Sequence, residues 1–165
     1  QDLAQRRPEL LRGLILSDSA TRIGTRLLWQ ERMALVQEKG LQHIADSIID
    51  RWLSEPYRRL YPGRTAIWRA LLLATPDAGY LGTCAVLRDA DLTPQAGDIN
   101  LPVACFCGSA DLATPPELVR RLAAMIPGAS YHEFNDVGHL PCIEAPREMA
   151  QQIERFIEEK KLANG

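Results

Sequence analysis

Three short apolar runs constrain the fold of this 165-residue chain more than any other feature of the sequence. They cover residues 12–18, 101–108 and 129–134, and each has the length of one buried strand. Helical patterns lie before the first run and after the other two: residues 1–7, 114–126 and 146–160. Because strands that alternate with helices pair in parallel, the sequence predicts an α/β fold with an open sheet and helices on both faces.

The region between the first two expected strands has a different pattern. From residue 25 to 92, apolar residues recur at helical spacing, and Gly40, Pro56 and Pro62 interrupt them. About four short helices and no strand are expected there. The sequence therefore predicts two domains: a core of residues 1–24 and 93–165, and a helical cap of residues 25–92 inserted into it.

Composition argues against several classes of protein. The net charge of −2 does not favour a nucleic-acid partner, and the longest apolar runs are too short for a membrane span of about 18 residues. The four cysteines do not have the paired spacing of a zinc site. They are expected to be free thiols in a cytoplasmic protein, with no metal bound.

Polar residues follow two neighbouring strands at the point where each strand ends. Asp111 comes after the strand of residues 101–108, and His139 follows the strand of residues 129–134. In a parallel sheet, such loops meet at the same edge, so the two side chains are expected to lie close together. A carboxylate that accepts a hydrogen bond from a histidine fixes its tautomer, and the histidine can then act as a general base.

Each of these residues also has a simpler interpretation. Asp111 alone is compatible with a turn or with the start of the next helix, where Thr114 is the expected N-cap. His139 alone is compatible with an ordinary loop histidine. His43 and His132 have no comparable context and are interpreted as structural. The order of Asp111 and His139 after successive strands favours a catalytic pair.

The same segments carry a family resemblance. The patterns P-V-x-x-x-x-G-S-A-D-x-A-T-P-P, from Pro102, and G-A-x-Y-x-x-F-x-x-V-G-H-L-P-C-x-E-x-P, from Gly128, resemble the C-terminal half of α/β-hydrolases. The resemblance implies that Asp111 is the catalytic acid and His139 the base. It also implies a helical cap over residues 25–92 and no metal or organic cofactor.

Within that family, residues 14–24, 79–92 and 113–116 are similar to 3-oxoadipate enol-lactonases. This likeness implies a small-molecule lactone or ester as substrate, hydrolysed in the catabolism of aromatic compounds. A second interpretation keeps the fold and changes the reaction: the same type of catalytic triad would hydrolyse another ester, a carbon–carbon bond or a haloalkane. A catalytically inert fragment is the third interpretation.

The nucleophile expected from this family does not occur in the sequence. The G-x-S-x-G elbow is absent, and Ser17 and Ser19, which follow a strand, have no flanking glycines. The elbow is expected just before Gln1, either in a separate chain or in a missing segment that forms the N-terminal half of the fold. The chain alone is accordingly expected to be inactive and prone to aggregation.

The lactone implied by the resemblance carries a carboxylate, so a cationic or N–H donor is expected in the cap. The candidates are Arg22, Arg69, Arg88 and the indole of Trp29. A structural ion pair is favoured for Arg88, because acidic residues follow it in the sequence. Leu112 and Leu140 lie next to Asp111 and His139 and are expected to line the substrate pocket.

Overall fold

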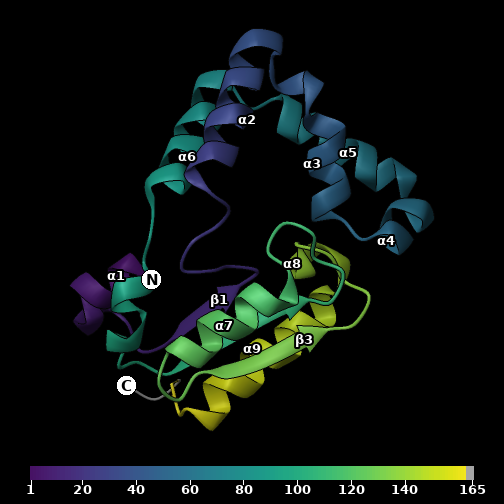
Figure 1. The fold of residues 1–165 in the computed structure, drawn as a ribbon. Coiled ribbons are helices and arrows are strands. Elements are labelled where there is room, and N and C mark those ends of the chain that lie inside the picture. Colours follow the sequence, from purple (N-terminus) through teal and green to yellow (C-terminus); the bar gives the residue numbers. More distant parts are fainter. Residues whose placement is uncertain (163–165) are drawn as a thin grey trace.

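Three parallel strands form the sheet in a computed structural model that describes residues 1–162 (Figure 1). They are β1 (Leu14–Ser17), β2 (Val103–Gly108) and β3 (Ser130–Phe134), and β2 lies between the other two. In the register, Leu14 is opposite Val103 and Ala104 is opposite Ser130. The predicted strands and their parallel pairing are confirmed.

Both faces of β2 are buried, so this strand supplies two separate cores. Cys105 and Cys107 face the core formed with α7 (Pro116–Met125), and Ala104 and Phe106 face the core that includes Phe156 of α9 (Pro146–Glu159). The alternation follows from strand geometry, in which successive side chains point to opposite faces. The expectation of helices on both faces is therefore confirmed.

Short helical elements precede or follow the strands. At the N-terminus, α1 (Asp2–Arg6) ends before Pro8 and is followed by one turn of 3₁₀ helix, Pro8–Leu10. Another 3₁₀ segment, Thr93–Asp98, leads into β2, and α8 (Pro141–Glu144) follows β3.

The segment between β1 and β2 forms what we term the helical insertion, residues 26–89. It contains five α-helices rather than about four, because Ser54 starts a new helix by accepting a hydrogen bond from the N–H of Tyr57. The five are α2 (Arg26–Lys39), α3 (Ala45–Trp52), α4 (Glu55–Leu60), α5 (Pro62–Leu73) and α6 (Asp77–Asp89). Between α2 and α3, Leu41–His43 forms a 3₁₀ turn.

The helical insertion has its own apolar core, with Val36, Leu41, Ile48 and Leu53 among its buried residues. It lies above the sheet in Figure 1, on the side where the loops after the strands emerge. α2 and α6 run alongside each other and connect the insertion to the strands below. This arrangement brings the inner surfaces of α2, α3 and α6 over the ends of the strands.

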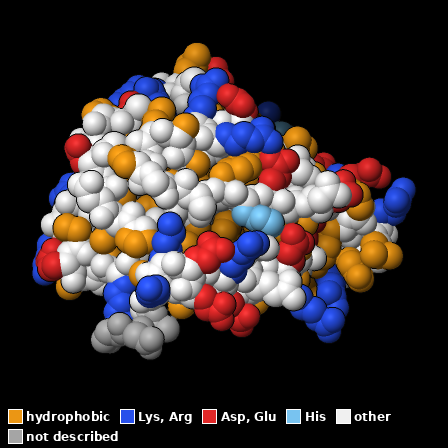
Figure 2. Space-filling model, turned by 90° about the horizontal axis from the view of Figure 1, so that it is seen from below, with side chains coloured by type: hydrophobic (Ala, Val, Ile, Leu, Met, Phe, Trp, Pro, Cys, Tyr) orange, Lys and Arg blue, Asp and Glu red, His pale blue; other side chains and the backbone are white. Residues whose placement is uncertain are grey.

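The surface carries charges of both signs. Figure 2 shows the face seen from below, where acidic and basic side chains are interspersed. No single helix within residues 1–162 is long and apolar enough to cross a membrane. α5 and α6 together meet that length and composition, but the chain bends by 89° between them.

Candidate active site

Two loops meet at the carboxyl ends of β2 and β3 because Gly108 has no side chain. A Cβ atom at this position would lie only 2.1 Å from the carbonyl oxygen of Gly138. The backbones are joined by hydrogen bonds from Ser109 N–H to the carbonyl of Phe134 and from Ala110 N–H to that of Val137, each 2.8 Å long. This close approach places the residues after each strand side by side.

Asp111 is buried in the first of these loops, with 1% of its surface exposed. Its Oδ1 accepts hydrogen bonds from the N–H groups of Ala113 (2.7 Å) and Thr114 (3.0 Å). Burial alone raises the pKa of such a carboxyl, but the hydrogen bonds from His139 and Thr114 outweigh it and hold the pKa of Asp111 below its ordinary value. Asp111 is therefore an anion with a fixed orientation.

His139 reaches Asp111 from the second loop. Its Nδ1 lies 2.9 Å from Oδ2 of Asp111, and its side chain is 22% exposed. Because Asp111 is ionised, the proton belongs on Nδ1, which leaves Nε2 as an acceptor on the other side of the ring. The main chain also holds His139, whose N–H donates to the carbonyl of Trp52 at 2.8 Å. The expected proximity of Asp111 and His139 is confirmed.

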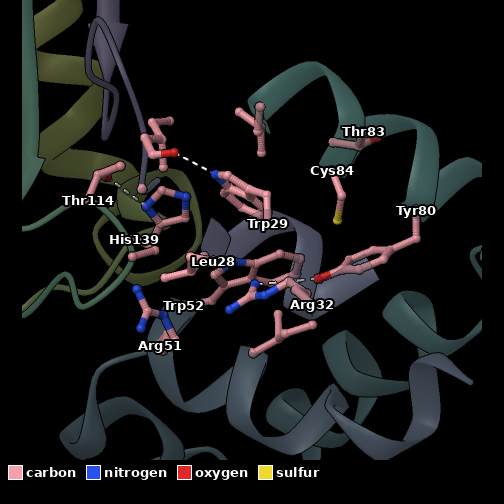
Figure 3. Close-up of a pocket in the computed structure, with 15 residues that line it drawn as sticks. Leu28, Trp29, Arg32, Arg51, Trp52, Tyr80, Thr83, Cys84, Thr114 and His139 are labelled. Atoms are coloured by element: carbon pink, nitrogen blue, oxygen red, sulfur yellow. Dashed lines mark hydrogen bonds between the residues drawn. The ribbon is translucent and has the colours of Figure 1, made fainter. Parts of the chain in front are cut away.

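Thr114 has a different role from the one predicted. The N-cap of α7 is Pro115, and the hydroxyl of Thr114 donates to Oδ2 of Asp111 at 2.7 Å. The hydroxyl oxygen of Thr114 also lies 3.2 Å from Nδ1 of His139 (Figure 3). The prediction of Thr114 as a helix cap is thus wrong, because its hydroxyl is buried beside a carboxylate that needs a donor.

A second carboxyl group lies beside this pair. Asp18 follows β1, is 7% exposed and has a left-handed backbone with φ of +49°. Its Oδ1 accepts from the N–H of Gly108 at 3.0 Å, and its Oδ2 accepts from the hydroxyl of Ser17 at 2.6 Å. Burial raises the pKa of Asp18 to about 7, with a smaller contribution from the negative charge of Asp111.

Asp18, Asp111 and His139 each offer a donor atom within 4.8 Å of the other two. Three such residues can hold a metal ion in principle. Nδ1 of His139 and Oδ2 of Asp111 face each other at 2.9 Å, which is an ordinary hydrogen-bond distance. The geometry fits a hydrogen-bonded pair.

A cavity of about 230 Å³ opens in front of His139, between the loops and the helical insertion. Its walls are mainly apolar and aromatic, and Figure 3 shows Trp29, Trp52 and Tyr80 around it. Thr114 and His139 form the end that belongs to the sheet. A pocket of this kind binds a small, largely apolar molecule and presents it to the imidazole.

Of the residues expected to bind substrate, Trp29 lines this cavity. Its indole N–H donates to the carbonyl of Ile23 at 2.6 Å, so the ring contributes an apolar surface rather than a free donor. Arg22 and Arg69 do not line the cavity, because they form ion pairs with Asp91 and Asp46.

The two leucines expected in the pocket also lie elsewhere. Leu112 is 58% exposed, and Leu140 packs against the core of the helical insertion. Neither lines the cavity in front of His139. Their neighbours Ala113 and His139 do, because the loop backbone turns between consecutive side chains.

Two further arginines line the cavity, Arg32 and Arg51, and the sequence did not indicate either as a substrate-binding residue. Arg32 lies 5.2 Å above the Trp29 ring and 3.5 Å from the Tyr80 hydroxyl, and Arg51 extends from α3 towards His139 (Figure 3). Neither forms an ion pair with an acidic residue in the described part of the chain. The sequence could have indicated Arg32 through helical spacing, because it lies one turn after Trp29 and therefore on the same face of the helix.

Comparison with known proteins is in keeping with this geometry. Residues 3–152 match the model of the alpha/beta hydrolase family. The chain belongs to this family. The alpha/beta hydrolase fold accounts for the order of strand, helical insertion and strand, and for polar residues at the strand ends.

Among related alpha/beta hydrolases, 3-oxoadipate enol-lactonase 2 of Acinetobacter baylyi is 29% identical over 93% of this chain and 57% of its own length. The crystal structure of the enol-lactonase of Burkholderia xenovorans is 31% identical, with a TM-score of 0.89 over 94% of this chain and 60% of that one. A thermophilic esterase of Thermogutta terrifontis is 25% identical, with a TM-score of 0.86 over 95% of this chain and 59% of that one. The chain thus spans less than two thirds of these relatives.

Proposed function

We propose that this chain carries the acid and the base of a hydrolase that acts on carboxylic esters or lactones, with 3-oxoadipate enol-lactone as the favoured substrate. The observation that carries the proposal is the partly buried hydrogen bond of 2.9 Å between Asp111 and His139 at the end of an apolar cavity. The enol-lactonases among the relatives support the choice of substrate.

The proposed mechanism requires a hydroxyl nucleophile from outside these residues. Among residues 1–162, no serine hydroxyl forms a hydrogen bond with His139; those of Ser17 and Ser54, for example, are bound to Asp18 and Glu144. We propose that the N-terminal half of the fold, as a separate chain or a preceding segment, supplies a serine and the oxyanion hole.

In the proposed reaction, Nε2 of His139 takes the proton of that serine as its oxygen attacks the ester or lactone carbonyl. The carboxylate of Asp111 keeps the proton on Nδ1 and stabilises the imidazolium that forms. His139 then returns the proton to the departing oxygen, and water hydrolyses the acyl-enzyme by the same route. The apolar walls of the cavity exclude bulk water from the reacting carbonyl.

Native purification from the source, followed by a substrate panel, tests this proposal. The panel contains the enol-lactone, simple carboxylic esters, a haloalkane and a compound with a cleavable carbon–carbon bond. We expect turnover of the lactone, and a loss of about 10²–10⁴ in kcat for His139→Ala or Asp111→Asn. Equal activity of these variants and the parent protein would contradict the assigned roles.

Two alternatives have distinct outcomes in the same experiment. Preferential turnover of another panel member would keep the catalytic pair and change the substrate. No turnover, together with no second polypeptide containing G-x-S-x-G in mass spectra of the native sample, would favour an inert protein. A cytoplasmic location is also our proposal, supported by four free cysteines, three of which are buried.

A further inference from the structure

The residue that the proposed mechanism leaves unused is Asp18, the buried carboxyl group at the end of β1. Its side chain is held from two directions, by the Ser17 hydroxyl and by the N–H of Gly108 at the end of β2. Its own N–H donates to the carbonyl of Phe106 at 2.8 Å. Asp18 is thus fixed at the same edge of the sheet as the loop that contains Asp111.

Asp18 lies close to both members of the Asp111–His139 pair. One oxygen of Asp18, one of Asp111 and one ring nitrogen of His139 all lie within 4.8 Å of one another. The left-handed backbone at Asp18 is uncommon outside glycine, and aspartate is among the few residues that tolerate it. That backbone turns the carboxyl group into the site.

The two carboxyl groups differ in their hydrogen bonds. Asp111 accepts from two backbone N–H groups, from the Thr114 hydroxyl and from His139, which together favour its charged form. Asp18 accepts from a single N–H and a single hydroxyl. When two buried carboxyls are this close, the one with fewer donors keeps its proton to a higher pH.

We propose that Asp18 is a second acid of the site, a positioning residue whose carboxylate can hold the imidazole of His139 when Asp111 cannot. The inference rests on the proposed function, because it concerns the same histidine. The ionisable groups that face Asp18 are Asp111, His139 and the thiol of Cys107 on β2, and its ionisation depends on all three. Below neutral pH the carboxyl is protonated and its effect on the histidine is small.

The first measurement needs no substitution. The ¹³C shift of the Asp18 carboxyl is followed by NMR against pH in the full chain, with Asp136 as the internal control. Asp136 is also an aspartate with positive φ, three residues before His139, but it is exposed. We expect Asp18 to titrate near pH 7. Titration of Asp18 near the ordinary value of 3.8 would overturn the proposal.

The second measurement tests the contact with His139 through the tautomer of its ring, read from ¹⁵N shifts at pH 8. In Asp111→Asn, we expect a large share of the ring to keep its proton on Nδ1, and the pKa of Asp18 to fall as the neighbouring charge is lost. In the double variant of Asp111→Asn with Asp18→Asn, the share of rings with the proton on Nδ1 is expected to fall towards the tautomer distribution of free imidazole.

The matched control is the double variant of Asp111→Asn with Asp136→Asn, which is expected to behave like Asp111→Asn alone. If the Asp18 and Asp136 double variants give the same ¹⁵N shifts, the proposal is wrong. If the double variants do not fold, the carboxyl titration in the unaltered chain decides. None of these readouts involves turnover, so a failure here is distinct from a failure of the proposed hydrolase activity.

Discussion

At the residue scale, Arg51 is the cation best placed to select a substrate. It lines the cavity beside His139 and makes no ion pair within residues 1–162, whereas Arg22 is neutralised by Asp91 outside the cavity. A cation that lines an apolar pocket favours a ligand with a negative group, because it can donate a charge-assisted hydrogen bond to that group.

Binding of levulinate and of its methyl ester to the chain tests this role of Arg51. We expect Arg51→Gln to weaken levulinate binding by about tenfold, the loss of one charge-assisted hydrogen bond, and to leave the neutral ester unaffected. Chemical shifts of the Trp29 and Trp52 indoles report the binding. Arg22→Gln is the control, and an equal effect of both variants on levulinate would argue against a specific contact.

Asp18 also makes the stability of the fold depend on pH. Burial raises its pKa to about 7 in the folded chain, above the ordinary value of 3.8. The folded state therefore binds the proton more tightly than the unfolded state. The contribution of Asp18 to the free energy of unfolding is fully present below pH 3.8 and is lost as the pH rises through 7. This loss is on the order of 4 kcal/mol at most.

Urea unfolding between pH 5 and pH 9 measures this dependence. We expect Asp18→Asn to flatten the fall in the free energy of unfolding over this range, since asparagine does not ionise. Asp136→Asn, at an exposed position, is expected to leave the slope of the parent chain unchanged. A parent chain whose stability is constant from pH 5 to pH 9 would contradict the raised pKa.

At the element scale, α8 ties the histidine loop to the helical insertion. Glu144 accepts from the N–H of Ser54 at 2.9 Å and from its hydroxyl at 2.5 Å, while the N–H of His139 donates to the carbonyl of Trp52. Gly138 allows this contact, because a Cβ there would lie 2.6 Å from the carbonyl oxygen of Trp52. The position of His139 thus depends on the junction between α3 and α4.

Removal of the Glu144 carboxylate tests the junction. Glu144→Ala leaves the buried N–H and hydroxyl of Ser54 without their partner, and we expect a loss of about 1–3 kcal/mol in the free energy of unfolding. Glu154→Ala, on an exposed position of α9, is the control and is expected to change stability by less than about 0.5 kcal/mol. A cost as small as that of the control would show that the junction does not depend on Glu144.

At the scale of the whole molecule, the sheet has two strand edges that no other strand covers within residues 1–162. Unpaired edges favour association with other chains. Several large apolar side chains on the helical insertion are also exposed, among them Leu60 at 68% and Ile67 at 59%. Both features are compatible with a surface that another polypeptide covers.

We therefore expect the chain on its own to self-associate as its concentration rises. Size-exclusion chromatography with light scattering measures this, and the share of higher-mass species should increase with concentration. A polypeptide that supplies the N-terminal part of the alpha/beta hydrolase fold should suppress the association. A monomer that melts cooperatively at every concentration, without such a partner, would refute the expectation.

Much of this organisation could be predicted because it depends on local patterns. The apolar runs fix the three strands, and the alternation with helices fixes their parallel pairing. Asp111 and His139 then meet because parallel strands end at one edge of the sheet. Thr114 could not be assigned in this way, since its sequence context is equally suited to a helix cap and to a bond with a buried carboxylate.

The sequence by itself determined the sheet, the two faces of β2 and the neighbouring positions of Asp111 and His139, because these follow from strand periodicity and chain direction. Only the tertiary structure decided which side chains share the cavity. Arg32 and Arg51 face it, whereas Arg22 and Arg69 are held in ion pairs elsewhere. The physical reason is that this choice depends on how five short helices pack over the strand ends, and packing between distant segments leaves no periodic signal in the sequence.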